Sequence, residues 1–236
     1  MGAERSGDEV GVVPMVRLST RSGRVEVIAE DRPDVRVEKG GRVVARDGDG
    51  EAVTVMSRTS AITARVPVGS RVVVGSVSGR VALSGRLGRV AVTTVSGRVT
   101  VESASRVELR SVSGRVSVEE CHGEARVDSV SARVTVDRAD SLWVSTKTGR
   151  VTAGAVTGSV RARTVTGRIT IGIDGAPVDA RLESVNGRIE LSLPAGVSPR
   201  QRFASRHGSI RSEVPEGDDG EVAARTASGA IRVRVG

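Results

Sequence analysis

The chain has 236 residues, 38% of them hydrophobic, but it holds one Trp, one Phe and no Tyr, which excludes a core built around aromatic side chains. Its formal net charge of +8 predicts phosphates, acidic polymers or anionic membranes as partners. The lone Cys121 excludes an intramolecular disulfide, and no stretch approaches the roughly 18 apolar residues of a membrane span.

The first third of the chain predicts a tail followed by short strands. Residues 1–13 are polar and lack the apolar segment of a signal peptide, so we expect a polar tail or cap and a cytoplasmic chain, with envelope association left open. A first copy of a later motif runs over residues 18–27. Alternating stretches at 35–37 and 53–55 predict strands, and the Asp-Gly-Asp-Gly at 47–50 predicts a turn.

From residue 76 onward the hexapeptide Ser-Val-Ser-Gly-Arg-Val returns with small changes. Its glycine position falls at 79, 97, 114, 132 (an alanine), 149, 167, 187, 208 and 229, in steps of 17 or 18 residues that lengthen to 20 or 21. A fixed period of this length is typical of stacked units, and Val and Thr alternate within each half of the repeat. The sequence therefore predicts an all-β fold, a single elongated parallel β-solenoid over residues 14–236.

Alternation also assigns faces within each coil. In the coil around residue 97 we expect Val95, Gly97, Val99 and Val101 to point inward. The residues expected to point outward are Thr94, Ser96, Arg98 and Thr100. A glycine on the inward side predicts a bend, where a side chain would collide with the neighbouring wall.

The repeats resemble a known family. The array Ser-x-Ser-Gly-Arg-Val-x-Val, with the Val-Pro-x-Gly corner at 66–69 and the early Ser-Gly-Arg-Val-Glu-Val at 22–27, is similar to the bacterial "putative adhesin" β-strand-repeat family of unknown function. The resemblance covers the chain from Met15 onward. It implies a β-solenoid, no catalytic residues, and an envelope or stress-associated role in some members. The family often has Asp where this chain has Arg, so its surface chemistry does not carry over.

One arginine follows each bend glycine, and these arginines form the candidate binding site. They are Arg80, Arg98, Arg115, Arg133, Arg150, Arg168 and Arg188. In a register-matched stack they stand about 4.8 Å apart, so neighbours repel by about 1 kcal/mol, yet the column attracts a linear polyanion or a row of small anions. Nucleic acid fits less well, because strand phosphates repeat at about 3.4 Å and the only stacking aromatics are Trp143 and Phe203. The alternative is a solvated column that protects the sheet from pairing.

Paired hydroxyls precede each bend, as in Thr94 with Ser96 and Ser111 with Ser113. Two outward columns of this kind resemble ice-binding surfaces, although Arg flanks them. The alternative is that the hydroxyls form hydrogen bonds along the stack and to the bend.

Catalytic residues are not assembled by the repeat. His122 and His207 lie far apart in the expected stack. Cys121 and His122 are sequence neighbours, so in a strand their side chains face opposite ways, and no third residue orients the imidazole of His122. The carboxylates do not repeat at coil spacing. We expect a non-enzymatic binding or scaffold module with no cofactor and no metal; the remaining enzymatic alternative is a β-helical polysaccharide-active protein.

The chain ends on an alternating strand at 230–236 without a capping helix. We expect this strand to be a free sheet edge, either blunted by Arg232 and Arg234 or used for self-association. Self-association would give a dimer or a filament similar to bactofilin-type bacterial scaffolds, and that is the alternative function.

Overall fold

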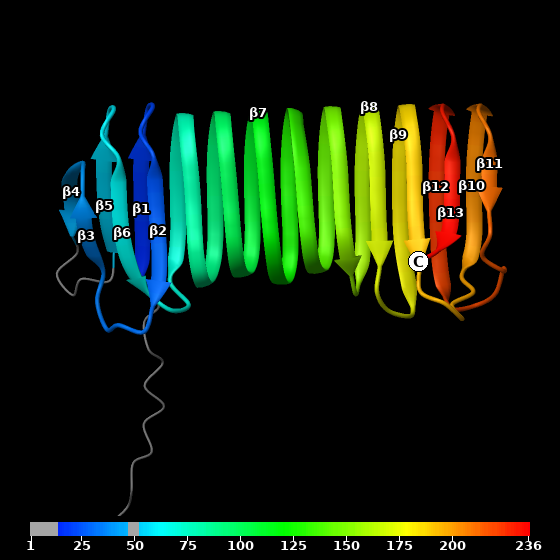
Figure 1. The fold of residues 1–236 in the computed structure, drawn as a ribbon, viewed down its shortest axis with the longest axis horizontal. Helices are drawn as coiled ribbons and strands as arrows, with labels where there is room; N and C mark the ends of the chain where they lie inside the picture. The colour runs from blue at the N-terminus through cyan, green and yellow to red at the C-terminus, as the bar shows by residue number, and fades with distance from the viewer. Residues whose placement is uncertain (1–13, 47–51) are drawn as a thin grey trace, which may run out of the picture.

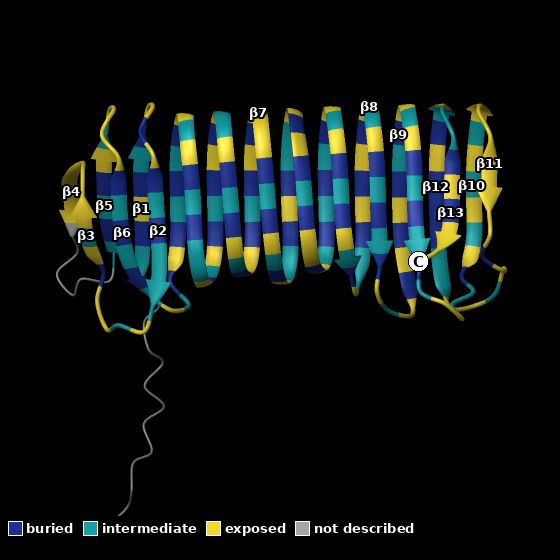
Figure 2. Ribbon diagram, viewed as in Figure 1, coloured by how far each residue is buried: buried dark blue, intermediate teal, exposed yellow. Residues whose placement is uncertain are grey.

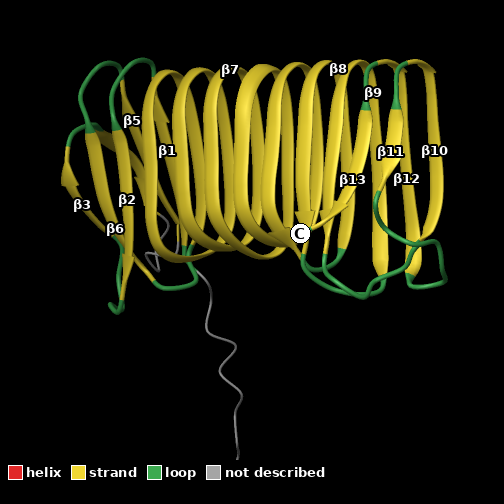
Figure 3. Ribbon diagram, turned by 45° about the vertical axis from the view of Figure 1, so that its right-hand side comes forward, coloured by secondary structure: helices red, strands yellow, loops and turns green. Residues whose placement is uncertain are grey.

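The computed structural model describes residues 14–46 and 52–236, so the expected tail at 1–13 and the expected turn at 47–50 lie outside the described residues. The described residues form strands and turns but no helix, and therefore no helix that could cross a membrane (Figure 3). The expected all-β class is confirmed. The strands are β1 (Met15–Thr20), β2 (Val25–Glu30), β3 (Arg36–Lys39), β4 (Arg42–Arg46), β5 (Ala52–Ser57), β6 (Ile62–Pro67), β7 (Arg71–Val156), β8 (Ser159–Ile173), β9 (Val178–Leu193), β10 (Arg200–His207), β11 (Ile210–Ser212), β12 (Gly220–Ser228) and β13 (Ile231–Val235).

Most strand pairs are parallel, and repeats align with repeats. The ribbon of β7 winds through successive turns over 86 residues, and β7, β8 and β9 then pair side by side (Figure 1). We call one level of this stack a rung. Gly149, Gly167 and Gly187 share one register position, and the arginine after each of them shares the next. Antiparallel pairing occurs where β3 meets β6 and β4 meets β5, so the sheet is mixed rather than purely parallel.

The core is a narrow column of Val, Leu and Ile side chains along the stack. Buried and exposed residues alternate along each strand (Figure 2), and Val99 and Val101, both expected to point inward, are buried. Leu83, Leu109 and Ile171 are among the largest fully buried side chains. Branched aliphatic residues pack well on a pleated strand surface, so a thin core can be filled without aromatic rings.

The face assignment fails at the bend before each glycine. Val95, expected inside, is 47% exposed, and Thr94, expected outside, is 3% exposed. The chain changes direction over residues 94–98, so strand alternation does not continue through the bend. Thr94 turns its hydroxyl inward and donates to the carbonyl of Ser96 at 3.5 Å. The inward hydroxyl thus satisfies a bend carbonyl, and the valine between them is left on the surface.

The paired hydroxyls therefore separate into one buried and one outer column. Ser111, Thr146 and Thr164 each donate to the carbonyl two residues ahead, at 3.1, 3.2 and 3.3 Å. The two outward columns that suggested an ice-binding surface are not present at these rungs. Hydrogen bonding to the bend, the other reading of the pattern, is confirmed there.

The bend glycines allow neighbouring rungs to approach closely. A Cβ added at Gly114 would collide with the carbonyl oxygen of Gly97, and Gly114 has a φ of +132°, a backbone conformation that favours glycine. The collision that a side chain would cause is therefore with the backbone of the neighbouring rung. Ala132 is the one replacement in this column, and it is buried.

At the N-terminal end, chain order and spatial order differ. β1 pairs with both β7 and β5, so the second turn of the chain lies outside the first. The antiparallel strands β3 and β4 then cover β6 and β5. Arg65 on β6 holds this cap through Glu30 and Glu38, both at 2.7 Å, and these carboxylates raise the pKa of the guanidinium group.

At the C-terminal end the order is exchanged in the same way. β12 pairs with β9 and β10, and β13 pairs with β9 and β11, so the last turn of the chain lies between two earlier ones. In Figure 1 the orange β10 and β11 lie beyond the red β12 and β13. The expectation that residues 230–236 form the free sheet edge is wrong: Ile231, Arg232 and Val233 pair on both sides. Insertion satisfies backbone groups on both sides of the last strand, which an end position cannot do.

Candidate anion-binding bend

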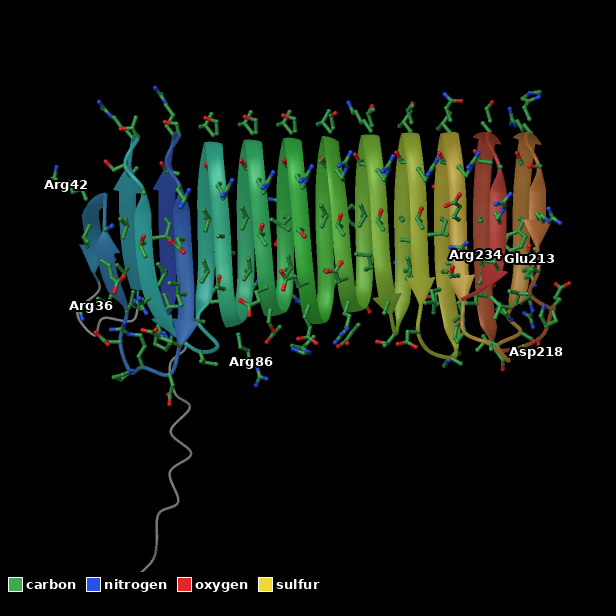
Figure 4. The ribbon with its side chains drawn as sticks, in the orientation of Figure 1. Arg36, Arg42, Arg86, Glu213, Asp218 and Arg234 are labelled. Atoms are coloured by element: carbon green, nitrogen blue, oxygen red, sulfur yellow. The ribbon has the colours of Figure 1, made fainter. Side chains whose placement is uncertain are left out.

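The expected site lies on one long edge of the molecule, which we call the glycine bend. It is built from the bend segment of each rung: residues 57–61, 20–24, 76–80, 94–98, 111–115, 129–133, 146–150, 164–168, 184–188, 226–230 and 205–209. The upper turns of the ribbon stand level along the long axis in Figure 1. Figure 4 labels Arg86 on the opposite, lower edge.

The expected arginines hold the same position in successive repeats, and we call them the arginine ladder. All seven are exposed, and Arg150, Arg168 and Arg188 are direct register partners. Arg188 lies 3.6 Å from Glu190. Within the described residues, none of the other six forms an ion pair. Their guanidinium groups are therefore available to an external anion.

A groove of about 580 Å³ runs beside the ladder. It exists because the glycine position carries no side chain, which leaves a trough between the ladder and the outer hydroxyl column. The residues that line it are Gly114, Ser131, Ala132, Arg133, Gly149, Arg150, Gly167, Arg168 and Arg188. Guanidinium groups match the geometry of phosphate and carboxylate groups, so this lining suits an anion.

The glycine bend contains no carboxylate in any of its segments, although the chain has 28 acidic residues. Besides the ladder it carries further cations at Arg21, Arg24, Arg58, Lys147 and Arg206. The opposite bend also holds Arg86, Arg106 and Arg138, but its acids outnumber these arginines: Glu102, Glu119, Glu120, Glu124, Asp137, Asp140 and Asp174. The molecule is therefore electrically polarised across its width, and the summed field draws anions to the glycine bend.

The charge along the ladder is uneven. In the rungs of Arg98, Arg115 and Arg133, a carboxylate follows four residues after each arginine, at Glu102, Glu119 and Asp137. The corresponding residues beside Arg150 and Arg168 are Gly154 and Gly172. Arg80 and Arg188 are likewise followed four residues later by serines, Ser84 and Ser192.

The aromatic side chains do not form a stacking platform on the glycine bend. Arg126 lies over the ring of Trp143, 4.1 Å from its centroid. Phe203 lies on β10 and lines a second hollow of about 620 Å³, whose lining includes Ser184, Val185 and Thr226 of the glycine bend. Neither ring lines the groove, which does not favour single-stranded nucleic acid as its occupant.

The candidate catalytic residues are not brought together. Cys121 is buried in the opposite bend, and this burial raises the pKa of its thiol. His122 contacts Glu120 at 3.5 Å in the same bend, whereas His207 lies on the glycine bend. The described residues contain no group of three or more His, Cys, Asp or Glu side chains that could hold a metal ion.

Two features of this edge were missed in the sequence. Arg24 extends the ladder by one rung, because Val25 pairs with Val81. The valines before each bend, such as Val95, face solvent rather than the core. Lys147 occupies the same repeat position, and a lysine there is the signal that could have identified it as an outward position.

Comparison with known proteins gives little further information. No family model matches the chain, and no curated protein matches it. A crystal structure of a "putative cell adhesion protein" from Clostridium sporogenes is similar over 95% of this chain and 93% of its own, with 10% identity and a TM-score of 0.27. A TM-score this low supports no transfer of fold or function, and the resemblance to the adhesin repeat family stays an expectation.

Proposed function

We propose that residues 14–236 form a single β-solenoid that acts as a non-enzymatic binding module, and that its glycine bend holds a linear anionic polymer. The observation that carries this proposal is the groove beside the arginine ladder, lined by four arginines and by no carboxylate. Bound anions would relieve the mutual repulsion of the stacked guanidinium groups, which favours occupation of every rung.

A polymer fits this site better than a single small anion. The ladder repeats at the rung spacing of about 4.8 Å, and the groove extends from Gly114 to Arg188. A linear chain of phosphates, sulfates or carboxylates can contact several rungs at once, and each added contact raises the effective concentration of the next group. An envelope polymer would agree with the family resemblance, and the groove offers no acid–base pair for cleaving such a chain.

Retention on heparin and polyphosphate resins tests the proposal. Replacing Arg98, Arg115, Arg133 and Arg150 by Gln should elute the protein at clearly lower salt, because four contacts to the polymer are lost. A matched control replaces Arg86, Arg106, Arg138 and Arg161 by Gln, which removes the same charge from other surfaces. The control should elute close to the unmodified protein.

If both variants elute at equally lowered salt, retention depends on net charge alone, and the ladder is not a binding site. Unchanged retention of the ladder variant would show the same. Circular dichroism of both variants verifies that the strands are intact.

A further inference from the structure

A row of exposed valines runs parallel to the arginine ladder on the glycine bend. Its members, which we call the valine row, are Val77, Val95, Val112, Val130, Val165 and Val185, each between 43% and 48% exposed. Lys147 takes the place between Val130 and Val165. Six rung spacings of about 4.8 Å separate the ends of the row, which is therefore about 29 Å long.

From Val77 to Val130 the valine row is uninterrupted, and Lys147 separates this part from Val165 and Val185. A shallow hollow of about 340 Å³ lies along it and is lined by Val95, Val112 and Val130 together with polar neighbours that include Thr93, Arg110 and Asp128. The Asp128 carboxylate is paired with Arg126 at 3.7 Å. Single exposed aliphatic side chains are common on proteins, but a line of them on one edge marks an interaction surface. An anionic polymer in the groove would not need this surface.

The surroundings of the row restrict what can cover it. Pairing two copies of this edge face to face would bring two arginine ladders together, and no segment of the glycine bend holds a carboxylate to compensate them. A partner surface that carries anionic groups, with an apolar layer beneath them, avoids this repulsion. The interfacial region of a membrane with anionic lipids has both properties.

We infer that the glycine bend docks on an anionic lipid membrane surface, with the valine row at the boundary between headgroups and acyl chains and the ladder on the lipid phosphates. This inference rests on the proposed function, since it uses the same arginines to bind anions. The level upper edge in Figure 1 can contact a plane along its whole length. The acidic opposite bend is repelled by the same surface, so only one edge faces the lipid.

Vesicle flotation tests the inference with the whole chain. Phosphatidylcholine vesicles containing about one third phosphatidylglycerol should carry the protein, whereas pure phosphatidylcholine vesicles should not. Replacing Val95, Val112 and Val130 by Thr should lower binding about tenfold, because the row loses apolar area but keeps its shape and strand propensity. The same variant should keep its full retention on polyphosphate resin.

A control variant replaces three equally exposed valines outside the row, Val43, Val68 and Val235, by Thr. It should bind vesicles like the unmodified protein. As a second measurement, Val112→Trp should show a blue-shifted emission with anionic vesicles, whereas Val235→Trp should not.

The outcomes separate the two proposals. Resin retention without vesicle binding, or a threonine variant that binds vesicles unchanged, overturns the membrane inference and leaves polymer binding standing. An unmodified protein that binds neither the resin nor the vesicles would overturn both the polymer proposal and the membrane inference. A Val112→Trp emission that stays unshifted on bound vesicles also overturns the inference, because the row then does not enter the interface.

Discussion

At the residue scale, two side-chain choices determine the glycine bend. Glycine permits close approach of neighbouring rungs. At the rungs of Thr94, Ser111, Thr146 and Thr164, the hydroxyl residue three positions before the bend glycine turns inward and donates to a bend carbonyl. These two requirements leave the valine and the arginine of the repeat on the surface. The arginine was identified from the sequence as a surface residue, whereas the valine was assigned to the core because alternation was continued through a bend that interrupts it.

Gly114→Ala should destabilise the protein by about 2–4 kcal/mol, because it combines an unfavourable φ with a collision against the carbonyl of Gly97. Gly69→Ala is the matched control, since Gly69 also has a positive φ but an added Cβ there meets nothing within 4 Å. It should cost only about 1–2 kcal/mol. Urea unfolding measures the free energy of unfolding of both variants. Equal losses would show that the close approach of neighbouring rungs does not contribute to the cost of Gly114→Ala.

At the scale of strands, the repeat predicted the individual elements well and their order in space poorly. The alternating stretches at 35–37 and 53–55 and the corner at 66–69 all lie in or beside strands. The exchanged order at both ends was not predictable, because β12–β13 and β10–β11 have similar patterns and either could pair with β9. The choice depends on the loops between them and on how many backbone groups each arrangement satisfies.

Removal of residues 230–236 should lower the free energy of unfolding by about 3 kcal/mol or more, because it takes an internal strand from between β9 and β11. Ile231→Ala should reproduce much of this loss, whereas Val235→Ala, at a position 46% exposed, should cost less than about 1 kcal/mol. Thermal unfolding measures these effects. A truncated protein of unchanged stability would contradict the insertion and restore the terminal strand as a free edge.

At the scale of the whole molecule, the two ends differ. The N-terminal end is covered by the short strands β3 and β4, each with an irregular register. The C-terminal end presents β10, whose only partner among the described strands is β12, and Ile210 of β11 is 44% exposed. Short, irregular strands resist edge pairing, whereas a long regular edge permits it. Assembly by the scaffold route would therefore use β10 rather than the chain terminus.

Because only one end offers a long regular edge, we expect concentration-dependent dimers and no longer polymers. Size-exclusion chromatography with light scattering across concentration and salt measures this. Ile210→Lys should shift the equilibrium towards the monomer by placing a charge beside the edge. Polymers that lengthen with concentration would contradict the difference between the ends, and a monomer at every concentration would rule out β10 as an assembly edge.

The sequence by itself determined the all-β class, the period of the repeat and the recurrence of an arginine after most bend glycines, because each follows from residue types recurring at a fixed period. The tertiary structure alone decided which side of the bend each residue occupies, where the first and last turns lie, and that the ladder shares its edge with a valine row. A period specifies which residues stack, but the direction of a side chain in a bend and the order of equivalent strands depend on hydrogen bonds between rungs.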